Sequence, residues 1–169
     1  MKINNILKIT AKRQVKALSF FLFYLFLLMI AYLITINLEE AFFVIFGPIS
    51  FFLVLPTLFL HVEYLFRNKK EEYELCGNRI IRRKENKEDV YYNEDVKKVE
   101  MFVSPNYFNN DVYFTAYANY HFAKVYLKSG EILYITSLLE PKGIDKAFNE
   151  YLKDIPYRKV KRLFATTFY

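Results

Sequence analysis

The sequence predicts a membrane α-helical hairpin followed by an α+β domain. Two runs near the N-terminus, residues 17–38 and 41–62, are each 22 residues long and contain no charged side chain. A helix of that length rises about 33 Å, enough to cross a hydrocarbon core of about 30 Å. From Glu71 onward, short alternating segments separated by turn residues replace these long runs, which predicts a small strand-rich domain.

The composition limits the function classes. The single cysteine, Cys76, excludes an internal disulfide framework and a cysteine-based zinc site, and the two histidines lie far apart in the sequence. The four glycines form no Gly-rich phosphate loop, and no serine has the context of a nucleophile elbow. We therefore expect no enzyme activity, and we assign no catalytic, cofactor-binding or metal-binding residue.

The net charge of +6 would suit nucleic acid, but the placement of the charges favours a membrane surface. Basic residues lie before the first span and after the second, whereas the short loop between the spans carries Glu39 and Glu40. By the positive-inside rule, we expect a multi-pass protein of the cytoplasmic (inner) membrane with both termini cytoplasmic. The first span is too long for a signal peptide, and no small-residue cleavage site follows it. The flanking basic residues are Lys2, Lys8, Lys12, Arg13, Lys16, Arg67, Lys69 and Lys70.

Residues 1–16 form a basic N-terminal lead-in that has two interpretations. Ile3, Ile6 and Leu7 would share one face of a helix with lysines near the other, which suits a helix lying on an anionic inner leaflet. The simpler alternative is that the lysines only set the topology.

The second span contains Pro48 and Pro56, and each proline is expected to bend the helix. Neither span contains Asp, Glu, Lys or Arg, which are the residues that mark transport pathways in membranes. His61, at the cytoplasmic end, is either an interfacial histidine at the headgroup level or part of a proton or metal site. The absence of other ionisable groups from the apolar interior favours the interfacial role.

The domain is expected to contain about seven strands. Gly77-Asn78 and Ser129-Gly130 are tight-turn dipeptides that join neighbouring strands into hairpins. Ser104–Asn110 is rich in Asn and contains Pro105, which predicts a loop. The expected strands are residues 71–76, 79–84, 89–92, 96–103, 111–117, 120–128 and 131–136.

One amphipathic helix is expected to close the domain. Its body is Gly143–Ile155, and Pro156 ends it. The apolar positions recur at helical spacing and define one face for burial against the strands. These positions are Ile144, Phe148, Tyr151, Leu152 and Ile155. A basic and aromatic tail, residues 156–169, follows.

Strands followed by one amphipathic helix resemble a pleckstrin-homology-like (PH-like) domain. The segments that carry the resemblance are GNRIIRR, DVKKVEMFV, AKVYLKSGEILYIT and IDKAFNEYL. It implies, for residues 71–155, a partly open barrel of about seven antiparallel strands capped by a C-terminal helix. Together with the hairpin at residues 17–66, the layout is similar to bacterial two-transmembrane-helix proteins with a cytoplasmic PH-like domain.

PH domains that bind phosphoinositides carry basic residues around the first hairpin, and this chain has a similar stretch. Acidic residues interrupt it, so the alternative is a solvated strand face close to an anionic leaflet. The tail carries a second basic cluster, which either docks on the membrane, packs along the domain or is a disordered end. The candidate contacts with anionic lipid are Arg79, Arg82, Arg83, Lys84, Arg158, Lys159, Lys161 and Arg162.

Aromatic residues cluster between Tyr107 and Tyr134, where they either fill a small barrel or form a contact surface. The expected function is a non-catalytic, membrane-tethered binding or scaffold module. The alternative is a small subunit of an oligomeric membrane transport or channel complex. The expected partners are the lipid bilayer, anionic lipid headgroups, and another protein or a second copy of the chain. No cofactor and no nucleic acid is expected.

Overall fold

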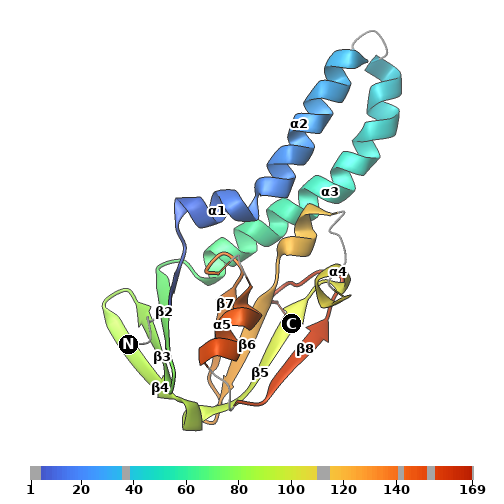
Figure 1. Cartoon of the computed structure of the whole chain (residues 1–169). Helices are drawn as coiled ribbons and strands as arrows, with labels where there is room; N and C mark the ends of the chain where they lie inside the picture. The colour runs from blue at the N-terminus through green and yellow to red at the C-terminus, as the bar shows by residue number, and fades with distance from the viewer. Residues whose placement is uncertain (1–4, 36–38, 110–114, 141–142, 152–154, 169) are drawn as a thin grey trace.

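The computed structural model describes residues 5–35, 39–109, 115–140, 143–151 and 155–168. Two β-sheets form the body of the molecule, and a pair of helices extends away from it (Figure 1). In chain order the elements are β1 (Asn5–Lys8), α1 (Ala11–Ala17), α2 (Ser19–Ile34), α3 (Glu39–Arg67), β2 (Glu71–Cys76), β3 (Arg79–Lys84), β4 (Lys87–Tyr92), η2 (Asn93–Asp95), β5 (Val96–Val103), α4 (Pro105–Asn109), η3 (Ala116–Asn119), β6 (Phe122–Leu127), β7 (Ile132–Thr136), α5 (Ile144–Tyr151) and β8 (Tyr157–Lys161).

Helices α2 and α3 occupy the two predicted spans, and α3 continues beyond the predicted end at Val62 to Arg67. In the described part of the chain, the stretch Phe46–Arg67 is long and apolar enough to cross a membrane. Helices α1 and α2, which meet at a bend of 56°, qualify as a second candidate only when taken together as one span. Both candidates qualify by length and composition alone.

The first sheet has the strand order β1-β2-β3-β4 and is antiparallel throughout. The surface helix, which was one of the two interpretations of the N-terminal lead-in, is wrong at Asn5–Lys8. This segment is a strand that pairs with β2 and places Leu7 opposite Tyr73. Leu7 is fully buried in the core, while Ile6 and Lys8 are exposed. Asn5–Lys8 is therefore a strand because this conformation buries Leu7 and pairs the free edge of β2. The helix begins only at Ala11. Ile3 lies outside the described residues.

The second sheet has the order β7-β6-β5-β8. The prediction of about seven antiparallel strands needs correction, because the described residues contain eight and β8 runs parallel to β5. β8 comes from the tail, which was not expected to contain a strand. Of the strand predicted at 111–117, residues 111–114 lie outside the described residues, and Ala116–Asn119 is a 3₁₀ turn. The predicted loop at 104–110 contains the short helix α4, which has Pro105 as its first residue.

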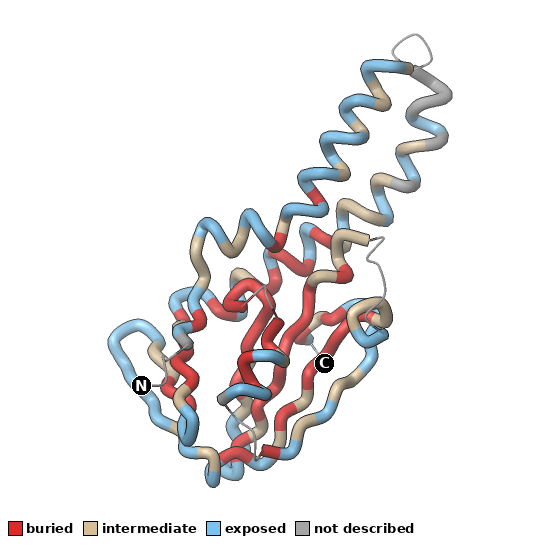
Figure 2. Tube along the Cα trace, in the orientation of Figure 1, coloured by how far each residue is buried: buried red, intermediate tan, exposed pale blue. Residues whose placement is uncertain are grey.

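The main core lies between the two sheets, with α5 packed across it (Figure 2). Val99, Met101 and Val103 face this core from β5, as the alternation predicts. Phe148 is 2% exposed, which confirms the predicted apolar face of the closing helix. Leu152, which was assigned to the same face, lies outside the described residues.

A second core lies on the outer face of the β5–β6 sheet, where the last turns of α3 pack. Leu60 and Tyr64 of α3 are buried there, and Tyr64 meets the ring of Phe122 edge to face at 6.2 Å. Phe122 in turn stacks on Phe102 at 4.7 Å. The helix hairpin and the domain therefore share a packed interface, and α3 is fixed to the sheet.

Candidate functional site

The basic residues predicted at the first hairpin lie along β3, and most of them are paired within the domain. Arg83 contacts Glu74 and Glu88, each at 2.7 Å. Arg82 and Lys84 both contact Glu71, at 2.7 and 3.0 Å. Arg79 lies exposed at the start of β3, opposite Tyr92 of β4. Carboxylates of the domain thus compete with any lipid phosphate for three of these four cations, and lipid contact by this set stays a prediction.

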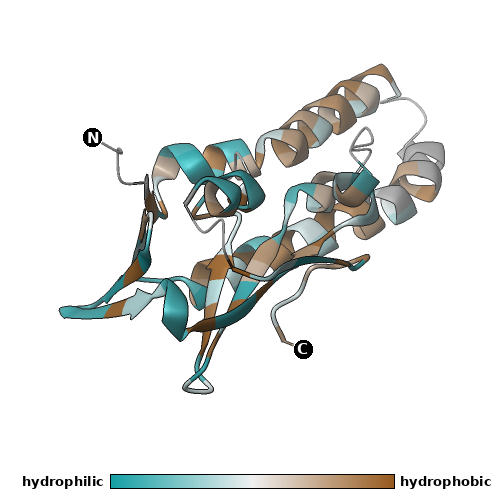
Figure 3. Cartoon of the chain, turned by 60° about the horizontal axis from the view of Figure 1, so that its bottom comes forward, coloured by the Kyte–Doolittle hydropathy of each residue, from teal (hydrophilic) through white to brown (hydrophobic). Residues whose placement is uncertain are grey.

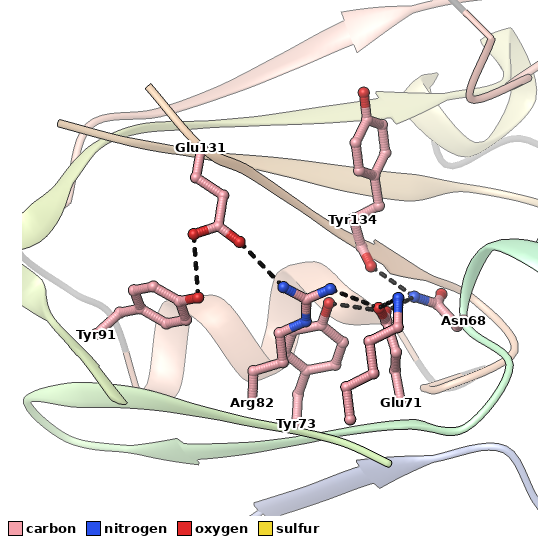
Figure 4. A network of polar contacts seen from close by, with 8 residues as sticks. Asn68, Glu71, Tyr73, Arg82, Tyr91, Glu131 and Tyr134 are labelled. Atoms are coloured by element: carbon pink, nitrogen blue, oxygen red, sulfur yellow. Dashed lines mark hydrogen bonds and ion pairs between the residues drawn. The ribbon is translucent and has the colours of Figure 1, made fainter. Parts of the chain in front are cut away.

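Glu71 is the centre of a polar network at the end of the two sheets (Figure 4). Its side chain is 5% exposed. One oxygen accepts hydrogen bonds from Arg82 and Lys84, and the other accepts from Asn68 and Tyr73, both at 3.0 Å. Burial by itself would raise the pKa of Glu71. The hydrogen bonds from Arg82, Lys84 and Asn68 outweigh burial and hold this pKa below its ordinary value.

The network also joins the two sheets. Arg82, on β3, extends to Glu131 just before β7 at 3.0 Å. Asn68, which follows α3, donates to the carbonyl oxygen of Tyr134 at 2.7 Å and accepts from the backbone N–H of Thr136 at 3.1 Å. These bonds connect α3, the first sheet and the second sheet at one place. The geometry therefore favours a structural role for Glu71, whose carboxylate is occupied by its own neighbours.

A groove of about 480 Å³ opens beside this network, between β1, the turn after α3 and the β3–β4 turn. Its lining mixes both signs of charge, so its potential is not that of a concentrated anion site. The charged lining residues are Lys8, Lys70, Glu71, Glu72, Arg83, Lys84, Glu85, Lys87 and Glu88.

The tail packs along the domain through residue 168, which is one of the three arrangements considered from the sequence. Lys159 pairs with Asp145 of α5 at 3.1 Å, and Lys161 lies 5.6 Å from the ring centre of Phe108. The backbone N–H of Arg162 bonds to the carbonyl oxygen of Val103, at the end of the β5–β8 ladder. Arg158, Lys161 and Arg162 remain exposed.

After β8, the tail crosses α3 and is held there by three contacts. The hydroxyl of Tyr64 donates to the carbonyl oxygen of Ala165 at 2.5 Å. Thr167 donates to one carboxylate oxygen of Glu63 from its backbone N–H at 2.5 Å and from its hydroxyl at 2.6 Å. Arg67 reaches the carbonyl oxygen of Thr167 at 3.4 Å. We call these contacts the tail clasp. No local pattern in the sequence indicates it, because it joins residues that are far apart along the chain.

Large apolar side chains surround the junction of α3 and the tail on the outside, and we call them the apolar collar. Three grooves cross the collar in the described residues, with volumes of about 420, 540 and 630 Å³. The exposed cations Arg67, Lys69, Lys70 and Arg162 line these grooves. The collar consists of Phe59 (55% exposed), Val62 (46%), Phe66 (71%), Leu163 (60%), Phe164 (43%) and Phe168 (73%).

The two histidines lie inside the structure and not at an open site. His61 is 7% exposed, and its Nδ1 lies 2.9 Å from the hydroxyl of Tyr120, so its ring is covered by the domain. His121 is 2% exposed, and burial lowers its pKa to about 4. Within the described residues, no group of three or more His, Cys, Asp or Glu side chains is arranged to hold a metal ion.

The aromatic cluster divides between the two roles considered from the sequence. Tyr120 and Phe122 are buried in the second core, whereas Phe108 is 43% exposed. Tyr113 and Phe114 lie outside the described residues. Most of the described aromatic side chains of this cluster thus belong to the two cores or pack against them.

Comparison with protein-family models matches residues 6–143 to a PH domain. The matched range begins in β1 and includes the hairpin helices and every strand up to β7. No curated protein and no solved structure matches the chain.

Proposed function

The chain belongs to the PH domain family, and from that premise we propose that it is a non-catalytic binding or scaffold module whose helical hairpin anchors it in a membrane. PH domains serve as binding modules, which is the coarse function that the family supports. The finer proposal is that the α2–α3 hairpin crosses the cytoplasmic membrane and holds the domain at its inner surface, where the domain binds its partner.

The observation that carries the proposal is the exposed apolar surface of the hairpin. On α2, Phe21 is buried, whereas Phe23 and Leu33 are 59% and 60% exposed. On α3, Val44 and Phe52 are 74% and 69% exposed. Apolar residues extend along both helices, while the β3–β4 hairpin is largely hydrophilic (Figure 3). Exposed apolar side chains along both helices indicate contact with lipid or with another protein.

The rigid attachment of α3 supports a scaffold role. The helix runs from the proposed span into the second core, where Leu60 and Tyr64 are 1% and 0% exposed. Helix α1, which leads into α2, is also attached to the domain. Its Arg13 contacts Glu140 at 3.3 Å and donates to the carbonyl oxygen of Leu139. Helix α3 is therefore attached to the domain directly, and α1 is attached through Arg13. These attachments would present the surfaces of the domain at a fixed orientation to the membrane.

The proposal is tested by membrane extraction and topology labelling of the full chain. After expression in cells, the protein should stay in the membrane pellet through an alkaline wash. In a Cys76→Ser background, a cysteine at Glu40 should react with an impermeant maleimide applied to intact cells, and a cysteine at Asn106 should react only after lysis. Release by the alkaline wash, or labelling at Asn106 in intact cells, would contradict the proposal.

A further inference from the structure

We infer that the apolar collar is embedded in the headgroup region of the inner leaflet, so that the last turns of α3 and the end of the tail lie in the membrane interface. This inference rests on the proposed membrane insertion of the hairpin. It goes further by assigning one face of the domain to lipid and by naming the side chains that enter it.

The two faces of α3 near its end indicate an apolar environment on both sides. Leu60 and Tyr64 are buried against the domain in the second core. The opposite face carries Phe59, Val62 and Phe66, which are 55%, 46% and 71% exposed. A helix on the surface of a soluble domain has polar residues on its outer face. An outward face that carries Phe59, Val62 and Phe66 therefore needs an apolar covering.

The position of the collar along α3 fits the membrane interface. The helix is continuous from Glu39 to Arg67, and the uncharged run ends at Val62. Phe66 lies four residues further on, about 6 Å along the helix axis. Each headgroup region is about 5–8 Å thick, from the difference between the whole bilayer and its hydrocarbon core. In Figure 1, moreover, α3 bends, and its last turns cross the end of the sheets.

The tail adds the second half of the collar, and the tail clasp fixes its place. Because Thr167 and Ala165 are bonded to Glu63 and Tyr64, the neighbouring Phe168 is held beside α3. The rings of Phe59 and Phe168 lie 6.3 Å apart. Phe168 is nevertheless 73% exposed, so it packs beside α3 without being covered by the domain.

The charges around the collar favour an anionic lipid surface as the occupant. Arg67, Lys69, Lys70 and Arg162 are exposed at its grooves, and of these Lys70 also pairs with the exposed Glu85 at 3.7 Å. Glu63, the acidic residue that contributes to the lining of these grooves, is 8% exposed and bonded to Thr167. Aromatic side chains beside basic ones are typical of the membrane interface. The collar is also continuous with the apolar surface of α3 above it, so a protein bound there would itself have to lie among lipid headgroups.

The chain contains no tryptophan, so a single introduced tryptophan reports its own surroundings. The full chain would be reconstituted in vesicles of phosphatidylcholine and phosphatidylglycerol, with bromine placed on the acyl chain either near the headgroup or deep in the core. The test variants are Phe66→Trp and Phe168→Trp. The controls are Phe26→Trp, on the proposed span, and Tyr92→Trp, on the edge strand β4. All four sites are at least 46% exposed, so the substitutions leave the cores intact.

The expected result is loss of fluorescence at positions 66 and 168 with shallow bromine, loss at position 26 with deep bromine, and no loss at position 92. Quenching at position 26 with full fluorescence at 66 and 168 would overturn the collar inference and leave the hairpin proposal standing. Absence of quenching at position 26 would refute the hairpin proposal, and the inference with it. Emission at 66 and 168 that resists bromine and changes with the ratio of protein to lipid would identify a second copy as the occupant and would also overturn the inference.

Discussion

Thr167, near the C-terminus, holds the buried carboxylate of Glu63 on α3 with two hydrogen bonds of 2.5 and 2.6 Å. Glu63 is 8% exposed, and a buried carboxylate is costly unless it is hydrogen-bonded. The end of the chain thus supplies two hydrogen bonds to this buried carboxylate, both of them to Oε1. The contact connects the proposed membrane anchor to the tail that completes the apolar collar.

Replacing Thr167 by Val should weaken this contact, because the hydroxyl bond is lost while the backbone bond remains. A hydrogen bond to a charged group contributes about 1.5–3 kcal/mol, and we expect a loss of that size in the free energy of unfolding. The measurement is unfolding of the full chain in detergent, with proteolysis of the tail as a second readout. Thr166→Val, one residue away, is the matched control, and equal effects of the two variants would contradict the role of Thr167.

Replacing Glu71 by Gln should destabilise the domain by about 3 kcal/mol, because Arg82 loses its most buried partner. The control is Glu72→Gln, since Glu72 contacts Lys8 at 3.9 Å and both side chains are about half exposed. Exposed pairs of this kind contribute about 0–1 kcal/mol. Chemical denaturation of both variants at neutral pH makes the comparison, and a smaller loss for Glu71→Gln than for Glu72→Gln would contradict the structural role of the network.

Glu71 should also make the free energy of unfolding depend on pH. The folded-state pKa of Glu71 lies below its ordinary value of 4.5, so the unfolded chain takes up the proton first as the pH falls. The stabilisation by ionised Glu71 is therefore complete above about pH 4.5 and is lost below it, as the pH passes through the lower folded-state pKa. Acid unfolding of the wild type should be steeper in this window than that of Glu71→Gln.

The extent of agreement between sequence and structure depends on how local the determining contacts are. The bounds of β2, β3 and β5 agree with those predicted, because a period of two residues and a flanking turn are local features. β1 and β8 were missed because each is short and gains its stability from a partner far along the chain, at Glu72–Leu75 and at Val99–Val103. At Ala116–Asn119, a 3₁₀ turn replaces the expected strand.

The candidate site also combines features that are local in the sequence with contacts that form only in the folded chain. The basic residues of β3 can be found in the sequence, but their partners cannot, since Glu71 meets Arg82 only after the strands pair and Glu131 arrives from the second sheet. The apolar collar likewise forms only when Phe168 is placed beside Phe59. The two ends of β3 also differ in their partners. Arg79, at its first position, is exposed, whereas Lys84, at its last position, contacts Glu71.

His121 should produce a loss of stability in mild acid. Its pKa is lowered by burial from 6.5 to about 4, so between these values the unfolded chain binds a proton that the folded chain does not. The contribution of neutral His121 to the free energy of unfolding should therefore be fully present above pH 6.5. It should fall by roughly 3 kcal/mol in total as the pH approaches 4. The measurement is the free energy of unfolding at several pH values for the wild type and for His121→Gln. The variant should have a flatter profile between pH 4 and 6.5 whatever its absolute stability, and an unchanged profile would assign the effect to another group.

The cations beside the collar should select anionic lipid more strongly than exposed lysines of the domain that line none of its grooves. Replacing Lys69, Lys70 and Arg162 by Gln removes three exposed charges at the collar grooves. Each basic group near an anionic surface is worth about 1 kcal/mol, so the triple variant should lose about 3 kcal/mol, on the order of a hundredfold in relative affinity.

A matched triple variant replaces Lys97, Lys128 and Lys146 by Gln, which also removes three exposed charges, none of which lines a collar groove. In vesicles that contain dansyl-labelled phosphatidylglycerol, energy transfer from a tryptophan at position 66 reports how much anionic lipid surrounds the collar. Transfer should fall in the collar variant, remain near the wild-type level in the matched variant, and decrease with added salt in the wild type because exposed charges are screened. Equal losses in the two variants would show that net charge, and not the placement of Lys69, Lys70 and Arg162, determines the lipid preference.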